Sequence, residues 1–137
     1  MSYPVEGSCQ CGQVTFKIHE APKMVIACHC KECQKLATAP YSVTAVIDYD
    51  KIEFSGELKE WSRPADSGNT STAAFCPDCG NRLYHYNPAD KATLKLKLKP
   101  VGLKDDAFYK PTVHVWTDEK QNWVEIPEGV KTFAKQP

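Results

Sequence analysis

All seven cysteines of this chain lie in three short motifs. The motifs are Cys9-x-Cys11, Cys28-x-Cys30-x-x-Cys33 and Cys76-x-x-Cys79. An odd number of cysteines cannot all pair as disulfides within one chain. Short gaps let neighbouring thiolates converge on one ion, and soft thiolates suit zinc. The spacing therefore predicts zinc sites.

Two other interpretations of these cysteines are weaker. A single free cysteine is usually a small buried hydrophobic residue, but these cysteines are grouped rather than scattered. A redox C-x-x-C of the thioredoxin kind belongs to a βαβ pattern, and Cys76 and Cys79 do not open a helix in such a pattern. In a reducing compartment disulfides would not persist. Metal binding remains the favoured interpretation.

Seven thiolates divide naturally into four and three. Four thiolates close a tetrahedral structural site, whereas three leave a fourth position open for water or substrate, as in catalytic zinc sites. The spacing leaves two divisions open. The C-x-x-C turns that begin at Cys30 and Cys76 could pair as in a zinc ribbon. Alternatively, the first and last motifs share one ion, and the compact middle motif holds the other.

His29 lies between two cysteines of the middle motif and is a candidate fourth ligand there. If this stretch is extended, alternate side chains point oppositely, so His29 would face away from Cys28 and Cys30. His29, Glu32 and Ser42 are also candidates to relay a proton near the open site. For all three the favoured interpretation is a surface position or a supporting contact to a ligand.

The pattern of apolar residues predicts a β-rich domain. A hairpin is expected from residues 52–54 and 58–61, and a short helix within residues 32–39, before Pro40. Leucine and lysine alternate over residues 94–99, and a solvated lysine face is favoured over an anion-binding face. Trp123 and Ile126 are expected to pack back on the sheet. Strands are predicted at residues 13–18, 23–27, 41–47, 70–75, 82–86, 94–99 and 111–116.

Length and charge limit the class of protein. A chain of 137 residues favours one domain over residues 1–137. Seventeen basic and seventeen acidic residues give a net charge of zero, which argues against a nucleic-acid partner. No apolar run approaches the roughly 18 residues of a membrane span, so no membrane partner is expected. The N-terminus lacks the basic and apolar regions of a secretory signal, which predicts a cytoplasmic protein.

The motifs resemble those of the glutathione-dependent formaldehyde-activating enzyme family, which includes the centromere protein V-like proteins. The resemblance extends over residues 5–126, and its three cysteine motifs occur in the family's order. The segments that carry it are GSCQCGQV at 7–14, CHCKEC at 28–33, FCPDCGNRL at 75–83 and KPTVHVW at 110–116.

The resemblance implies a fold and two zinc ions per chain. The fold would be a single-domain β-tent of antiparallel sheets with zinc knuckles, similar to methionine sulfoxide reductase B. The family's activity joins glutathione and formaldehyde into S-hydroxymethylglutathione, which in the reverse sense is a carbon–sulfur lyase reaction. The implied ligands are Cys9, Cys11, Cys76 and Cys79 for a structural zinc, and Cys28, Cys30 and Cys33 for a catalytic zinc.

The chemistry of three thiolates agrees with this implication. An open position on zinc can bind an incoming thiol and keep it as the nucleophilic thiolate. Three thiolates weaken the metal as a Lewis acid, so the site suits a small thiol or thiol–aldehyde adduct better than hydrolysis. The alternative is a zinc-stabilised binding module without catalysis. Methionine sulfoxide reduction is a weaker interpretation, because it needs a metal-free nucleophilic cysteine and none follows Cys79.

Overall fold

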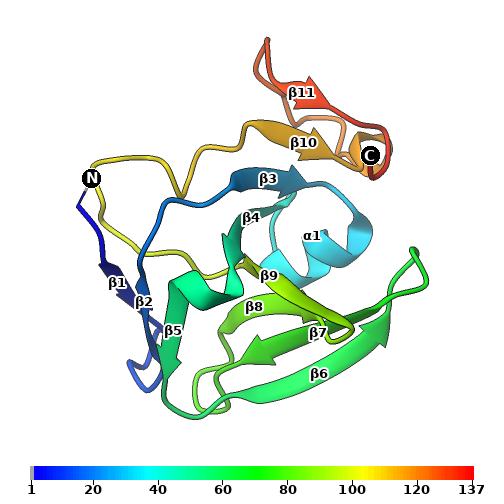
Figure 1. Ribbon diagram of the computed structural model, residues 1–137. Coiled ribbons are helices and arrows are strands. Elements are labelled where there is room, and N and C mark those ends of the chain that lie inside the picture. Colours follow the sequence, from blue (N-terminus) through cyan, green and yellow to red (C-terminus); the bar gives the residue numbers. More distant parts are fainter. Residues whose placement is uncertain (1) are drawn as a thin grey trace.

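The computed structural model describes residues 2–137, in which β-strands form two sheets (Figure 1). The smaller sheet has the antiparallel order β1-β2-β5, with β1 at Val5–Ser8, β2 at Thr15–Ile18 and β5 at Ile52–Ser55. Side chains alternate between the two faces of a strand. Phe16 and Ile18 therefore point into the core, whereas Thr15 and Lys17 are exposed.

The larger sheet has eight strands. They are β3 (Met24–Cys28), β4 (Ser42–Asp48), β6 (Lys59–Pro64), β7 (Thr70–Phe75), β8 (Arg82–Asn87), β9 (Asp90–Leu96), β10 (Val113–Val115) and β11 (Lys131–Thr132). Their order is β11-β10-β3-β4-β9-β8-β7-β6. The mainly β fold predicted from the sequence is confirmed. Most neighbouring strands pair antiparallel, as predicted, and β10 is the exception because it runs parallel to both β3 and β11. A long connection leads into β10, which allows the parallel pairing that a tight turn forbids.

One α-helix, α1 at Lys31–Ala37, follows β3 directly. The Cys30 sulfur caps its start by accepting a hydrogen bond from the Cys33 amide at 3.3 Å. Thr38 ends the helix in the left-handed conformation, with φ of 47°, ahead of Pro40. The short helix predicted in this segment is confirmed. Two 3₁₀ turns complete the helical structure, η1 at Tyr49–Lys51 and η2 at Thr117–Glu119.

The hydrophobic core lies between the two sheets and draws side chains from both. Leu94 and Leu96 of β9 are fully buried there, as their alternation with lysine predicts. Burying such side chains is the main favourable contribution to folding. Other fully buried members are Val14, Ile18, Leu83 and Phe108.

The hairpin predicted from residues 52–54 and 58–61 is wrong. β5 pairs with β2 in the small sheet, whereas β6 pairs with β7 in the large one. Gly56 lies at the corner with φ of 108°, where any side chain would collide with the backbone of Gln13. The Gln13 side chain also bonds both backbone groups of Glu57, accepting from its N–H and donating to its carbonyl at 2.9 Å. These contacts hold the chain in a crossing between sheets instead of a tight turn.

The C-terminal segment packs differently from the prediction. Trp123 is 70 % exposed, and Val124 beside it is buried instead. The expected packing of Trp123 on the sheet is therefore wrong, while β11 adds a strand that the sequence pattern did not predict. Among the residues that the structure describes, no helix combines the length and apolar character needed to cross a membrane.

Gly7 is expected to be sensitive to even a small side chain. It lies opposite Phe16 in the β1–β2 pair, and a Cβ at Gly7 would overlap the Phe16 ring. Overpacking of this kind costs about 1–3 kcal/mol, so Gly7→Ala should lower the free energy of unfolding by that amount. Denaturant titration measures this, with the outward-facing Ser8→Ala as the control. Equal unfolding midpoints for the two variants would contradict the prediction.

Candidate metal centres

The first and last cysteine motifs converge in space. Their four sulfurs lie within 4.8 Å of one another; the cysteines are Cys9, Cys11, Cys76 and Cys79. The Sγ–Sγ distance is 3.6 Å from Cys9 to Cys11 and 3.7 Å from Cys11 to Cys76. A tetrahedral zinc with Zn–S bonds of about 2.3 Å would hold its sulfurs about 3.8 Å apart. The spacing and the donor type of this four-cysteine cluster therefore suit zinc.

The turns that follow β1 and β7 bring these sulfurs together. Gly80, with φ of 79°, closes the second turn by donating its N–H to the Cys76 carbonyl at 2.9 Å. N–H groups also point at the sulfurs: the Val14 amide donates to Cys9 at 3.3 Å, and the Gln13 side chain donates to Cys76 at 3.2 Å. Such donors stabilise thiolates. Cys9 and Cys76 are buried, so this cluster is part of the packed interior.

The middle motif forms a separate three-cysteine cluster. The sulfurs of Cys28, Cys30 and Cys33 lie within 4.8 Å of one another. Cys28 ends β3, Cys30 caps α1, and Cys33 lies in the first turn of that helix. Cys33 is buried, whereas the other two are partly exposed. Three donors with access to solvent leave one corner of a tetrahedron free. The structure thus divides the cysteines into four and three, and the zinc-ribbon pairing of Cys30 with Cys76 is not observed.

The thiols of the three-cysteine cluster share their protons. Hydrogen bonds from Cys28 and Cys30, with the positive charge of Lys97 nearby, lower the pKa of Cys33 to about 2. The same contacts raise the pKa of Cys28, because its proton is held between sulfurs. Negative charge is therefore favoured on Cys33, the buried member of the cluster.

Lys97 is the cation next to this cluster, and its position differs from the prediction. Its Nζ donates to Thr44 Oγ1 at 2.6 Å and to Ser42 Oγ at 3.5 Å. Burial lowers the pKa of Lys97, which the charge of Cys33 partly offsets. The favoured interpretation of a solvated lysine face is therefore wrong at this position. It rested on an edge strand, whereas β9 lies inside the sheet between β4 and β8.

His29 does not join the three-cysteine cluster. It is fully buried, with Nε2 2.8 Å from Nδ1 of His114 on β10 and its ring against Tyr41. Burial lowers the pKa of His29 to about 4, and the nearby His114 adds to this effect. Its Nδ1 has no hydrogen-bond partner within residues 2–137. The backbone N–H of His29 donates to Val115 at 3.0 Å, so this residue links the cysteine loop to β10.

The two remaining proton-relay candidates lie in different environments. Ser42 is buried beside Lys97, and its side chain bonds Cys33 and helps lower the pKa of that thiol. Glu32 is exposed and lies 3.5 Å from Lys35 one turn along α1. Ser42 therefore supports the cluster, as the favoured interpretation predicted, while Glu32 is a surface residue.

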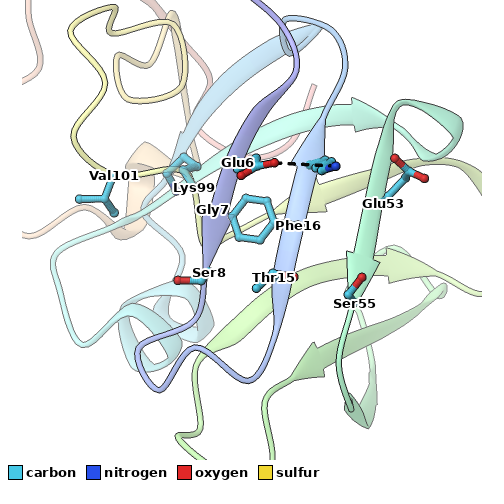
Figure 2. Close-up of a pocket in the computed structure, with 10 residues that line it drawn as sticks. Glu6, Gly7, Ser8, Thr15, Phe16, Glu53, Ser55, Lys99 and Val101 are labelled. Carbon is cyan, nitrogen blue, oxygen red and sulfur yellow. Dashed lines mark ion pairs between the residues drawn. The ribbon is translucent and has the colours of Figure 1, made fainter.

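A cavity of about 690 Å³ lies elsewhere, on the outer face of the small sheet (Figure 2). Glu6, Lys17 and Glu53 line it, together with Lys99 and Val101 from the segment after β9. The cysteines are not among its lining residues. Lys17 and Glu6 already neutralise one another at 3.8 Å, and the Lys99 ammonium is bonded to backbone carbonyls. The chemistry of the chain is therefore concentrated at the cysteine clusters.

Fold and sites together define a small, mainly β protein with a closed set of four cysteines and an open set of three. A family model described as glutathione-dependent formaldehyde-activating enzyme matches residues 4–119, so the chain belongs to this family. A protein of Halomonas elongata, named as a candidate glutathione-dependent formaldehyde-activating enzyme, is 28% identical over 142 aligned residues, which cover 97% of this chain and 88% of the relative.

A solved structure shares the fold. A crystal structure of a Rhodobacter sphaeroides protein superposes with a TM-score of 0.58 at 14% sequence identity. The match covers 78% of this chain and 97% of that one. At this level of identity the likeness concerns the arrangement of the strands alone.

Proposed function

We propose that this protein is a zinc-dependent carbon–sulfur lyase that acts on a small thiol–aldehyde adduct, with glutathione and formaldehyde as the thiol and the aldehyde. The observation that carries the proposal is the three-cysteine cluster, which has two partly exposed members and a partly buried cation beside it. Membership of the family supports the choice of substrates. A zinc ion held by Cys28, Cys30 and Cys33 would bind the substrate sulfur and keep it as a thiolate.

The reaction requires charge to develop on that sulfur. In the direction of cleavage, the hydroxymethyl adduct loses its hydroxyl proton and its C–S bond breaks. The electron pair of that bond moves to sulfur, formaldehyde leaves, and the thiolate regains a proton on release. Lys97 is placed to stabilise negative charge beside the cluster, and Ser42 and Thr44 hold its ammonium in position.

The four-cysteine cluster is proposed to hold a second, structural zinc. Its sulfurs have a tetrahedral spacing, two of them are buried in the core, and its donors are complete without substrate. The four-cysteine cluster would thus stabilise the fold, and the three-cysteine cluster would support the reaction.

Metal content and catalysed exchange test this proposal together. Protein purified under reducing conditions without added metal should contain about two zinc ions per chain by elemental analysis. It should also accelerate the exchange between glutathione, formaldehyde and their adduct, measured by NMR exchange spectroscopy against the spontaneous rate. Zinc at two per chain with no acceleration would contradict the proposed reaction.

Lys97→Met should slow this reaction. Loss of the partly buried cation leaves the charge on sulfur unbalanced, which should lower kcat by roughly tenfold to a hundredfold. Zinc content and KM should change little, because Lys97 is not one of the clustered ligands. Lys91→Met removes an exposed charge from β9, the strand that ends just before Lys97, and is the control. Equal kcat for the two variants would contradict a role for Lys97.

A further inference from the structure

A row of side chains crosses one face of the large sheet beyond the three-cysteine cluster. Trp61 of β6 is opposite Ala73 of β7, which is opposite His85 of β8. Paired residues in a sheet project from the same face. Trp61 is 51 % exposed, whereas His85 is buried. In Figure 1 the sheet extends from β9 through β8 and β7 to β6, so this face leads away from β4 toward the outer edge.

Arg82 is held in position over this row. Its Nη1 lies 3.2 Å from Nε2 of His85, and its guanidinium carbon lies 5.5 Å from the centre of the Trp61 ring. Burial, together with the charges of Lys97 and Arg82, lowers the pKa of His85 to about 3. The imidazole is therefore neutral near pH 7, and its nitrogen accepts the hydrogen bond from Arg82. A guanidinium oriented in this way is prepared to bind a planar anion.

The positive charges around His85 have no carboxylate partner in the structure. Lys97, Arg82 and Arg63 all lie close enough to His85 to lower its pKa. None of these three cations takes part in an ion pair within the described part of the chain. Arg63 donates only to the neighbouring Pro64 carbonyl, at 3.2 Å. The Cys33 thiolate beside Lys97 is the nearest negative charge, so the two arginines farther along the sheet are left without a carboxylate partner, which favours the binding of an anion there.

The acidic residue nearest in the strand is directed elsewhere. Glu60 precedes Trp61 on β6, so it projects from the opposite face. There it accepts a hydrogen bond from the hydroxyl of Tyr86 at 2.6 Å. The face that carries Arg82 is thus left cationic.

This cationic strip, formed by Trp61, Arg63, Arg82, His85 and Lys97, begins at the three-cysteine cluster. Lys97 reaches Ser42, and Ser42 is opposite Cys28 in the β3–β4 pair. Lys97 also pairs with β8 through its backbone, donating to the Leu83 carbonyl at 2.8 Å. A ligand whose sulfur lies at the cluster would therefore extend past Lys97 toward Arg82.

We propose that Arg82, assisted by Arg63, binds a carboxylate of the substrate thiol and makes this site selective for anionic thiols. This inference rests on the proposed function, since it places the substrate sulfur at the three-cysteine cluster. Arg82 acts as the binding residue, and His85 positions it. The Trp61 ring lies against the guanidinium and supports it.

The test separates binding of the carboxylates from chemistry at sulfur. S-methylglutathione keeps the carboxylates of glutathione but cannot form the adduct, whereas glutathione diethyl ester keeps the thiol and lacks free carboxylates. Calorimetric titration at low salt should show that Arg82→Gln weakens S-methylglutathione binding by about tenfold, as expected for one charge-assisted contact. Binding of the diethyl ester should be unchanged.

Three further variants complete the experiment. Arg82→Lys, which keeps the charge but not the fork, should recover part of the affinity. Arg63→Gln should weaken binding to a smaller extent, and it provides a second measurement if Arg82→Gln folds poorly. Lys17→Gln removes a charge from the small sheet and should have no effect.

The outcomes distinguish this inference from the proposed function. Weaker S-methylglutathione binding by Arg82→Gln, in a protein that shows no exchange activity, would support the strip and overturn the proposed reaction. Normal exchange activity, with equal binding of S-methylglutathione by the unmodified protein, Arg82→Gln and Arg63→Gln, would overturn the strip alone. Absence of S-methylglutathione binding to the unmodified protein would also overturn it.

Discussion

Replacing Cys30 with serine is expected to abolish exchange activity and remove one zinc ion while the fold survives. Cys30 is partly exposed, and the hydrophobic core does not depend on it. Loss of a group that merely supports a metal ligand costs about 10–100-fold in activity or affinity, so loss of a ligand should cost more than about a hundredfold. The remaining zinc should stay with the four-cysteine cluster.

Elemental analysis, circular dichroism and the exchange assay measure these three effects on one sample. Ala37→Ser, at the last turn of the same helix, introduces the same hydroxyl away from the cluster and should retain both zinc ions. Unchanged turnover in Cys30→Ser would contradict the proposed catalytic site. Unfolding of Cys30→Ser would instead favour the alternative of a zinc-stabilised binding module, in which both clusters are structural.

Replacing Cys76 with serine is expected to unfold the domain, whereas the Cys30→Ser variant should stay folded. Cys76 is fully buried in the core, and its sulfur lies 3.7 Å from that of Cys11. A structural zinc in small peptides contributes about 10–16 kcal/mol, which is comparable with the whole stability of a typical domain, about 5–15 kcal/mol. Losing even part of this contribution should leave little folded protein at 25 °C.

Thermal unfolding followed by circular dichroism measures the effect, with zinc content determined on the same material. Asp78→Ser is the matched control, because it alters an exposed residue between the two cysteines of the same turn. That variant should melt like the unmodified protein. A folded Cys76→Ser protein with an unchanged melting temperature would contradict a structural role for the four-cysteine cluster.

Local patterns in the sequence were sufficient to predict most of the strands and the short helix. Alternation of polar and apolar residues predicted β2 and the end of β9, because side chains of a strand that packs on a core must alternate, and runs of β-forming residues predicted the strands at 23–27 and 41–47. The hairpin over residues 52–61 could not be judged in this way. Its outcome depended on Gln13, which lies far away in sequence and binds Glu57 at the crossing between the sheets.

The residues around the three-cysteine cluster also could be predicted only where they are close in sequence. Cys28, Cys30 and Cys33 are recognisable from their spacing, since a short loop and one helical turn suffice to bring them together. Lys97 directly follows β9, far away in sequence, and its alternation with leucine is equally typical of a solvated face. The only local signal was the run of lysines itself. Such a run is expected to face solvent on an edge strand, but β9 lies inside the sheet between β4 and β8.

His114, His85 and Arg82 were not identified as site residues from the sequence. Each is an isolated polar residue in or next to a strand, and such residues usually have no role in a site. His114 matters through a hydrogen bond to His29 across 85 residues, and Arg82 through its contacts with His85 and Trp61. Contacts of this range depend on the register between strands, which no local pattern encodes.

The sequence by itself determined that this chain is β-rich and that its cysteines form motifs with the spacing of metal ligands. Thiolate chemistry and short spacing act locally, so both are visible in the order of residues. Tertiary structure alone decided that Cys9 and Cys11 share a cluster with Cys76 and Cys79, since the turns after β1 and β7 meet only in the folded chain. It also placed Lys97 at the open cluster, because strand order in a sheet is set by long-range packing.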